Sequence, residues 1–374
     1  MNKKYRIAVM PGDGIGTEVM EAGRLVLDVL RLDAEYVHAD VGWEFWRREG
    51  NPLPQRTVDI LKSCTCALFG AITSKPKEET ENELAPELRG KGLSYRSPIV
   101  HLRQLFDLYI ALRPCKAYPG NPLNYREDIN LVVFRENTEG LYSGIEFHPV
   151  PEEVRTALEK HGGQMRLFKN VPSEEMAVGL RVITRKGSQR IIRAAFEFAQ
   201  KFGYPKVTLV EKPNVLRETS GLMIQEGKRV ASQFPGIRLE MTNIDAQMMW
   251  LLKNPREYGV LVTSNLFGDI LSDLASQLVG GLGFACSGNL GDRFALFEPV
   301  HGSAPKYAGL YKVNPMAMLL TVKMMLDWLR EKEKAAALES AIAAVIAEGW
   351  VRTYDMGGSS STSEMAQAVA RKIS

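Results

Sequence analysis

The sequence predicts an α/β fold, in which helices cover both faces of a sheet. Short apolar runs alternate along the chain with longer segments whose apolar residues recur at helical spacing. The chain has 374 residues, which suggests about two domains. Its apolar fraction of 45% and charged fraction of 24% are those of an ordinary globular protein. These observations exclude a disordered chain, a collagen-like chain and a small disulfide-stapled domain.

The predicted strands are short apolar runs bounded by turn-forming or polar residues. The second of these runs ends at Gly70, and Asn265 follows the fifth. The expected strands cover residues 7–10, 66–69, 131–134, 207–210 and 258–262.

Amphipathic helices are expected between and after these strands. In one of them Ile191, Ala195 and Phe198 belong to a single apolar stripe, which predicts one buried face. The expected helices cover residues 17–32, 188–202, 221–234, 268–278, 315–331 and 334–347.

Two segments depart from this alternation. The charged segment 75–91 is interrupted by proline and glycine, and we expect a surface loop. The segment 148–169 carries many charges with Pro149, Pro151 and Gly162, and it is expected to leave the core as an interaction arm.

The charge balance argues against two classes of partner. Lys and Arg number 47 and Asp and Glu 44, a surplus of three positive charges, and the two signs are interspersed. A nucleic-acid partner is therefore not expected, because such proteins cluster their basic residues. No stretch approaches 18 uncharged apolar residues, and the N-terminus lacks a signal-peptide core. We expect a cytoplasmic protein without a membrane contact.

The four cysteines indicate a reducing compartment. Cys64 and Cys66 are too close together for the usual zinc pair, and no second pair lies near them. With Cys115 and Cys286 they are expected to be buried thiols rather than metal ligands.

A glycine-rich turn, GDGIG at 12–16, follows the first predicted strand and opens a helix. Such a turn can cradle a phosphate, but the spacing departs from G-x-G-x-x-G. A tight structural turn is the favoured interpretation, and a nucleotide site is the alternative.

Three arginines, Arg103, Arg113 and Arg135, each stand next to an apolar residue near a predicted strand or helix end. The planar guanidinium matches a carboxylate with two hydrogen bonds. Convergence of the three would suit a substrate with two or three carboxylates. The alternative is three surface arginines with packed stems.

Asp269 and Asp273 lie four residues apart on a predicted helix and therefore share one face. Oxygen ligands favour Mg²⁺ or Mn²⁺, while a solvated acidic face is the alternative.

Lys212 and Tyr142 are candidate proton-transfer groups. The segment 301–309 gathers an imidazole, an ammonium and a phenol before a helix, as a nucleotide-phosphate loop does, although an unliganded turn has the same pattern.

Together these motifs resemble the isocitrate/isopropylmalate dehydrogenases, which oxidise and decarboxylate 3-substituted malates with a nicotinamide cofactor and a divalent metal. The resemblance covers nearly all of the chain. The motifs that carry it are GDGIG at 12–16, LFGAIT at 68–73, LR at 102–103, RP at 113–114, RENTEGLY at 135–142, Lys212 with Asn214, NLFGDILSD at 265–273, GGLG at 280–283 and EPVHGSAPKYAG at 298–309.

The resemblance implies a fold of two α/β domains that is not a Rossmann fold. The large cofactor-binding domain is expected at residues 1–117 and 258–374. A small inserted domain is expected at 118–257, with a dimer arm at about 147–185. Members are homodimers or tetramers of dimers with shared active sites.

The resemblance also assigns roles to residues. The expected substrate-binding residues are Ser97, Arg103, Arg113 and Arg135. The expected catalytic pair is Tyr142 and Lys212, the latter from the partner subunit. The expected metal ligands are Asp245, also from the partner subunit, Asp269 and Asp273. The expected cofactor-binding residues are Thr73, His301, Gly302, Ser303, Ala304, Lys306, Tyr307, Asn314 and Tyr354.

Similarity to particular members of the family narrows the choice of substrate and cofactor. Ser97 resembles isocitrate enzymes, whereas Ile99 and Val100 resemble isopropylmalate or homoisocitrate enzymes. Isocitrate or homoisocitrate is favoured, and 3-isopropylmalate is the alternative. Lys306-Tyr307 replaces the Asp-Ile of NAD-specific members, so NADP is favoured and NAD remains open. A non-catalytic regulatory subunit is disfavoured because the catalytic residues are present.

Overall fold

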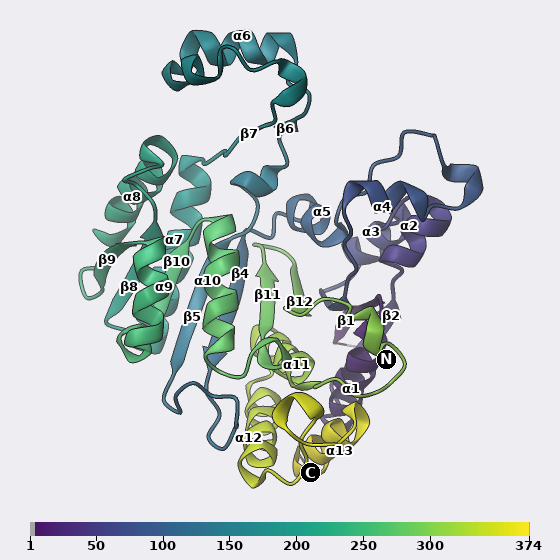
Figure 1. Cartoon of the computed structure of the whole chain (residues 1–374). Helices are drawn as coiled ribbons and strands as arrows, with labels where there is room; N and C mark the ends of the chain where they lie inside the picture. Colours follow the sequence, from purple (N-terminus) through teal and green to yellow (C-terminus); the bar gives the residue numbers. More distant parts are fainter. Residues whose placement is uncertain (1–3, 374) are drawn as a thin grey trace.

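A ten-stranded sheet crosses the computed structural model, which describes residues 4–373 (Figure 1). Its strands lie in the order β2-β1-β3-β12-β11-β4-β5-β10-β8-β9, and β6 pairs separately with β7. The strand bounds are β1 (Tyr5–Gly12), β2 (Ala34–His38), β3 (Cys66–Ala71), β4 (Ile110–Lys116), β5 (Asn130–Glu136), β6 (Glu146–Phe147), β7 (Val178–Gly179), β8 (Lys206–Glu211), β9 (Arg238–Asn243), β10 (Val260–Thr263), β11 (Cys286–Leu290) and β12 (Ala295–Pro299).

Helices cover both faces of this sheet (Figure 1). Their bounds are α1 (Gly16–Val29), α2 (Trp43–Glu49), α3 (Gln55–Lys62), α4 (Lys77–Asn82), α5 (Pro98–Leu105), α6 (Glu152–His161), α7 (Arg185–Phe202), α8 (Arg217–Ala231), α9 (Ile244–Lys253), α10 (Asn265–Gln277), α11 (Met316–Trp328), α12 (Lys332–Glu348) and α13 (Thr362–Ile373). Short 3₁₀ turns are η1 (Pro86–Leu88), η2 (Leu141–Ser143), η3 (Gly163–Phe168), η4 (Ser173–Glu175), η5 (Pro255–Glu257), η6 (Leu282–Phe284), η7 (Pro305–Tyr307) and η8 (Tyr354–Met356).

The predicted α/β class is confirmed, and the five predicted strands are β1, β3, β5, β8 and β10. Most neighbouring strands are parallel, but β11 is antiparallel to both β12 and β4, and β4 is antiparallel to β5. The prediction missed strands whose sequences are not apolar runs. Strand β4 contains Arg113 and Pro114, and the edge strand β9 reads RLEMTN.

The buried side chains of β5 explain how the sheet joins its helices. Val132 and Phe134 point to one face and pack in a cluster with α7 and α8. Leu131 and Val133 point to the opposite face and pack with α9 and α10. Because both faces are covered, the strand is a continuous apolar run rather than an alternating one. The other half of the sheet packs against α1, α11, α12 and α13 on one face.

The sheet passes through both predicted domains without a break. Strand β10, which the predicted boundary assigns to the large domain, lies between β5 and β8 of the predicted insert. The boundaries at 117/118 and 257/258 stay a prediction.

The predicted surface loop at 75–91 is partly wrong, because it contains the short helix α4 and the turn η1. Helix α4 covers the buried indole of Trp46, whose Nε1 donates to the carbonyl of Thr80 at 2.8 Å. Anchoring an indole N–H in this way orders a charged segment that composition alone describes as loop.

Residues 146–179 form an arm that stands away from the sheet (Figure 1). It consists of β6, α6, η3, η4 and β7, and α6 has no buried residue. Arg155 holds the arm together by donating to the carbonyls of Val171 at 2.7 Å and Lys169 at 2.9 Å. The arm is therefore internally ordered although it lacks a core of its own.

The thiols of Cys66, Cys115 and Cys286 are buried and that of Cys64 is half-buried, and all four are free. Burial raises the pKa of Cys66, Cys115 and Cys286, so these thiols are unreactive near neutral pH. Within residues 4–373 no helix is both long and apolar enough to span a bilayer.

Candidate active site

Three arginine side chains converge where α5, β4 and β5 meet α10. Arg103, Arg113 and Arg135 are only 6%, 5% and 1% exposed, so the alternative of three surface arginines is wrong. Burial is the largest cause that lowers the pKa of Arg135 to about 9, and the neighbouring charges of Arg113 and Arg103 add to it. The three guanidinium groups therefore repel one another, and nearby anions are needed to offset their positive charge.

Asp269 on α10 is the carboxylate at the centre of this cluster. Its Oδ1 accepts from Arg135 Nη1 and lies 3.3 Å from Arg113 Nη1, and its Oδ2 accepts from the Tyr142 hydroxyl at 2.5 Å. Burial alone would raise the pKa of Asp269, but Arg135, Arg113 and the Tyr142 hydrogen bond outweigh it and lower the pKa. The carboxylate is thus held in its charged form.

Asp273 lies one turn further along α10, 3.4 Å from Arg113 Nη1. Burial raises its pKa against the attraction of Arg113, and the neighbouring Asp269 adds to the rise. Both carboxylates therefore face the same guanidinium.

Polar residues that the sequence analysis missed hold the arginines in place. Asn265 accepts from Arg135 Nε at 3.0 Å and Nη2 at 2.8 Å. Asn289 accepts from Arg103 Nε at 3.0 Å, and Glu298 accepts from Arg103 Nη2 at 3.1 Å. Asn265 is the first residue of the motif at 265–273, and Glu298 is the first residue of the motif at 298–309. Their place in these motifs was the signal in the sequence that could have identified them.

Helix α10 approaches β5 closely because Gly268 has no side chain. A Cβ at Gly268 would lie 2.6 Å from Cγ and 3.2 Å from Cα of Arg135. The glycine therefore permits the contact between Asn265, Asp269 and Arg135.

Tyr142 sits in the turn η2 between two glycines with left-handed backbone, Gly140 at φ 78° and Gly144 at φ 72°. Burial raises the pKa of Tyr142, and its hydrogen bond to Asp269 raises it further. The phenol consequently stays protonated at neutral pH and can donate a proton.

Lys212 and Asp245 form a second, separate group. Lys212 follows β8, Asp245 lies in the first turn of α9, and Nζ is 2.6 Å from Oδ1. This hydrogen bond lowers the pKa of Asp245. In the described part of the chain, no three Asp, Glu, His or Cys side chains gather as a metal site would require. One chain therefore brings Asp269 and Asp273 together but leaves Asp245 with Lys212.

The glycine turn is structural, because its amide groups are already used. The N–H groups of Asp13 and Ile15 donate to the carbonyls of Ala71 and Ser303, both at 2.9 Å. The Asp13 carboxylate accepts from the backbone N–H of Trp43 at 2.7 Å and of Thr73 at 2.8 Å. A carboxylate in this position would also repel a phosphate.

The expected cofactor residues lie beside this turn in two groups. Thr73 Oγ1 and Ser303 Oγ are 2.6 Å apart. His301 Nδ1 lies 3.0 Å from the Gly302 carbonyl, whereas Nε2 is buried without a partner among residues 4–373. Burial lowers the pKa of His301, so the imidazole is neutral. Ala304 has a left-handed backbone at φ 36°.

The second group lies further along the loop. The rings of Tyr307 and Tyr354 stack with centroids 5.5 Å apart. Asn314 Nδ2 donates to Asp355 at 3.0 Å, and Lys306 is exposed. Ser97 lies at the N-cap position of α5, two residues from the buried Ile99.

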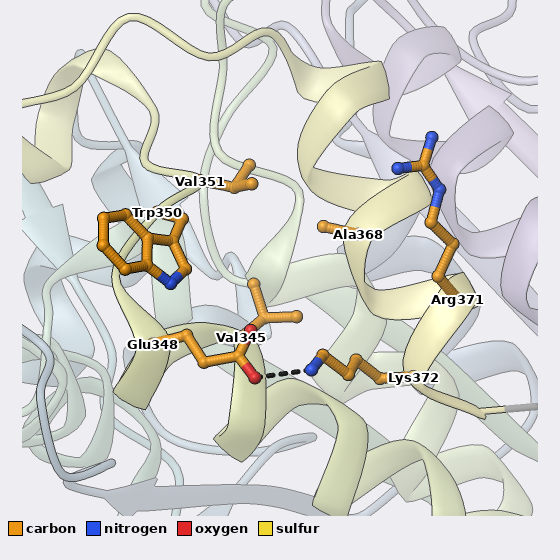
Figure 2. Close-up of a pocket in the computed structure, with 7 residues that line it drawn as sticks. All are labelled: Val345, Glu348, Trp350, Val351, Ala368, Arg371 and Lys372. Carbon is orange, nitrogen blue, oxygen red and sulfur yellow. Dashed lines mark hydrogen bonds and ion pairs between the residues drawn. The ribbon is translucent and has the colours of Figure 1, made fainter.

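A hollow between α12 and α13 lies apart from these groups (Figure 2). It measures about 160 Å³, and Glu348 pairs there with Lys372 at 2.5 Å beside Trp350, which is 87% exposed. None of the expected site residues lines it.

The family model for isocitrate/isopropylmalate dehydrogenase matches residues 6–369. The chain belongs to this family. It is 43% identical over 371 residues to a 3-isopropylmalate dehydrogenase of Methanothermobacter thermautotrophicus, with 99% of each chain covered. It is 41% identical over 373 residues to an isocitrate/homoisocitrate dehydrogenase of Thermus thermophilus, with 99% of this chain and 98% of the relative covered. A crystal structure of isocitrate dehydrogenase from Methylococcus capsulatus matches with a TM-score of 0.85, 36% identity and 99% of both chains covered. Another curated relative is longer, and the chain spans 58% of its length.

The protein is accordingly an NAD(P)-dependent β-decarboxylating dehydrogenase that acts on a small carboxylate substrate. The family uses a nicotinamide dinucleotide and a divalent metal ion. The relatives carry different substrate names, so family membership leaves the particular malate open.

Gly268→Ala should destabilise the protein by about 1–3 kcal/mol, because an added methyl overpacks the contact with Arg135. The Michaelis constant for substrate should rise as Arg135 shifts. The matched control is Gly221→Ala on α8, where a Cβ meets nothing within 4 Å and should stabilise the helix by about 0.4–1 kcal/mol. Thermal unfolding and steady-state kinetics measure both effects. Equal behaviour of the two variants would contradict the close approach of α10 to β5.

Proposed function

We propose that this chain oxidises and decarboxylates a 3-substituted malate whose side group ends in a carboxylate, either isocitrate or homoisocitrate. The observation that carries the proposal is the cluster of three buried guanidinium groups, in which Arg113 Nε lacks a partner among the described residues. A divalent cation next to Asp269 and Asp273 would offset their charges. The arginines would then have an excess of positive charge, which a tricarboxylate offsets more fully than a dicarboxylate does.

An apolar side group is the alternative, and a specific observation favours it. Ile99 is only 8% exposed, and with the half-buried Val100 it follows Ser97 into α5. Such neighbours suit the branched side group of 3-isopropylmalate better than a carboxylate. The assay below decides between the two.

The aspartates on α10 suit a divalent cation. Asp269 and Asp273 lie one helical turn apart, and both approach Arg113 Nη1, at 3.3 and 3.4 Å, so their carboxylates face a common point. Carboxylate oxygens are hard ligands, which favour Mg²⁺ or Mn²⁺ over softer metals. Asp245 is the third expected ligand, and in the same chain it pairs with Lys212 instead.

A second copy of the chain would complete the site. Lys212 and Asp245 stand at the surface next to exposed apolar side chains: Val215 is 66%, Met249 71% and Trp250 42% exposed. Such a patch is typical of a protein interface. We infer a homodimer, or a tetramer of dimers, in which Lys212 and Asp245 face Tyr142, Asp269 and Asp273 of the other subunit, with the arm at 146–179 as a further contact.

The reaction follows from these positions. The dinucleotide and the cation supply, when bound, the hydride acceptor and the Lewis acid. Arg103, Arg113 and Arg135 bind the substrate carboxylates and orient the C2 hydroxyl. Lys212 takes the hydroxyl proton as the hydride leaves C2. The 2-oxo acid then loses CO₂, and Tyr142 delivers its proton to the carbon of the resulting enolate.

The cofactor loop has features that suit a dinucleotide. His301 Nε2 is a buried polar atom without a partner among residues 4–373. There is also open space beside Gly302, because a Cβ added there would lie 4.0 Å from its nearest neighbour, the carbonyl oxygen of Ile72. Lys306 offers a cation, and the stacked Tyr307 and Tyr354 offer phenols, where an adenosine 2′-phosphate would need donors. We infer that NADP is preferred over NAD.

The test of the proposal is a substrate panel. Isocitrate, homoisocitrate, 3-isopropylmalate, D-malate and tartrate are each assayed with NADP and NAD in the presence of Mg²⁺ or Mn²⁺. The highest kcat/KM is expected for isocitrate or homoisocitrate. A highest value for 3-isopropylmalate would support the alternative, and turnover of none of the five would overturn the proposal.

Activity should require a divalent metal. Excess EDTA is expected to abolish turnover, and added Mg²⁺ or Mn²⁺ to restore it. Asp269→Asn should weaken Mn²⁺ binding by about tenfold or more, measured by the electron paramagnetic resonance of free Mn²⁺. Full turnover in EDTA would show that no dissociable metal takes part.

Lys212→Met and Tyr142→Phe should impair different half-reactions. Removal of Lys212 is expected to slow substrate oxidation, and removal of the Tyr142 hydroxyl to slow protonation after decarboxylation. Single-turnover assays with the hydroxy acid and with the added 2-oxo intermediate separate the two. A Tyr142→Phe variant that slows reduction of the intermediate but spares its decarboxylation would contradict these roles.

Two inactive variants should complement each other if the site is shared. Lys212→Met retains Asp269, and Asp269→Asn retains Lys212, so a mixed dimer has one intact site. Unfolding and refolding an equal mixture should recover about a quarter of the wild-type activity by random pairing. Each variant refolded alone is the control. Absence of recovery in dimers shown to be mixed would mean that each chain builds its own site.

Lys306→Asp combined with Tyr307→Ile should shift preference from NADP toward NAD. A charge-assisted hydrogen bond contributes about 1.5–3 kcal/mol, so each lost contact should reduce NADP discrimination by roughly tenfold or more. The ratio of kcat/KM values for the two cofactors measures the shift. An NAD preference in the wild type, or an unchanged ratio in the variant, would show that these residues do not bind the phosphate.

A further inference from the structure

The residue before Lys212 is a buried carboxylate with no part in the proposed reaction. Glu211 ends β8, and its side chain is 1% exposed. It accepts from Ser220 Oγ at 2.5 Å, from the backbone N–H of Ser264 at 3.2 Å and from Arg181 Nη2 at 3.0 Å. A carboxyl group buried this deeply needs hydrogen-bond partners, and these partners hold the end of β8 in place.

Arg181 supplies one of these three donors and joins Glu211 to the surrounding elements. Its Nη1 donates to Thr219 Oγ1 at 2.7 Å and to Ser220 Oγ at 3.2 Å. Its Nη2 donates to Ser264 Oγ at 2.8 Å as well as to Glu211. One guanidinium thereby joins the end of β8, the start of α8 and the residue that precedes α10. A lysine ammonium offers three donors from one nitrogen and cannot reproduce this fork.

The network reaches the backbone of Lys212. The N–H of Lys212 donates to Ser220 Oγ at 3.4 Å, the hydroxyl that Arg181 and Glu211 both contact. The carbonyl of Lys212 accepts from the N–H groups of Val215 and Leu216, which fixes the turn into α8. The side chain then extends from a backbone that is held on both sides.

The same arginine is anchored at the base of the arm. Arg181 follows β7, and the carbonyl of its neighbour Val182 accepts from the N–H of Gly140 at 2.8 Å, beside the turn that carries Tyr142. Its guanidinium also lies 5.2 Å above the ring of Phe267. The chain therefore leaves the arm and enters the Lys212 network at a fixed point.

We propose that Arg181 is a positioning residue that, through Glu211 and Ser220, sets the position of Lys212 for proton removal from the substrate hydroxyl. This inference rests on the proposed function, in which Lys212 takes that proton. Arg181 touches no reacting atom, and we expect it to act mainly on the step that Lys212 performs. It also contacts Ser264 and Phe267 at the start of α10. Asp269 and the arginine cluster have further supports of their own, because Asn265 accepts two hydrogen bonds from Arg135.

The test compares Arg181→Lys and Arg181→Ala with a matched control, Arg185→Ala. Arg185 also pairs with a buried glutamate, Glu226, at 3.0 Å, and within residues 4–373 no hydrogen bond or ion pair joins that pair to Lys212. For each variant we would measure thermal unfolding, the Michaelis constants, the single-turnover rate of hydroxy-acid oxidation and the rate of decarboxylation of the added 2-oxo acid.

Arg181→Lys should slow oxidation by about 10- to 100-fold, as expected for a misplaced catalytic group. The Michaelis constants and the decarboxylation rate should stay within about twofold, because Tyr142 and the arginine cluster keep their geometry. Millimolar guanidinium should restore oxidation in Arg181→Ala. Arg185→Ala should lose stability without a selective loss of oxidation.

Three results would overturn the inference: a parallel fall of both half-reactions in Arg181→Lys, an equal loss of oxidation in Arg185→Ala, or an Arg181→Lys variant as active as wild type. Failure of the proposed function is distinguishable, because the wild-type chain would then turn over no member of the substrate panel.

Discussion

Burying three guanidinium groups beside one another is the constraint on which the centre of this molecule depends. Like charges out of water repel strongly, and each must be hydrogen-bonded on every side that faces protein. The chain meets most of this demand with Asn265, Asn289, Glu298 and the α10 aspartates, while Arg113 Nε has no partner among the described residues. Helix α10 must then lie against β5, which a glycine at 268 permits. The local fold is thus arranged around positive charges that stay incompletely offset, which is why we propose that an anionic substrate binds there.

The sequence predicted the α/β class, five strands and the long helices well, because buried strands such as β3 and β10 are unbroken apolar runs. It failed where tertiary contacts override local pattern. Strand β9 lies at the edge of the sheet, where a mixed polar and apolar sequence is sufficient. Helix α4 is ordered by the hydrogen bond from the Trp46 indole to the carbonyl of Thr80. The residue pattern already grouped the three arginines, and the resemblance gave them a role. Their buried supports could not be derived, since Asn289 and Arg103 are 186 residues apart.

The glycine turn illustrates how the same residues acquire different chemistry. Three glycines and an aspartate after a strand have the composition of a phosphate-binding turn, yet the amides of Asp13 and Ile15 donate to protein carbonyls. The aspartate caps α2 and holds the backbone of Thr73. A structural turn and a phosphate-binding turn differ in how many backbone N–H groups are free to donate, and this number is known only from the folded chain. A motif of this kind therefore has to be judged by its unused hydrogen-bond donors.

The tryptophans differ in solvent exposure, so the intrinsic fluorescence of the protein can distinguish between them. Trp350 is almost fully in water at a turn after α12, whereas Trp46 is buried and Trp43 donates from its indole to Glu83 at 2.6 Å. The backbone of Trp43 is tied through Asp13 to Thr73, beside the cofactor loop. Iodide would quench Trp350, and in part Trp250, which is 42% exposed, more than the buried Trp43 and Trp46. The remaining fluorescence can then report changes near Thr73, where we propose that the dinucleotide binds, without an attached dye.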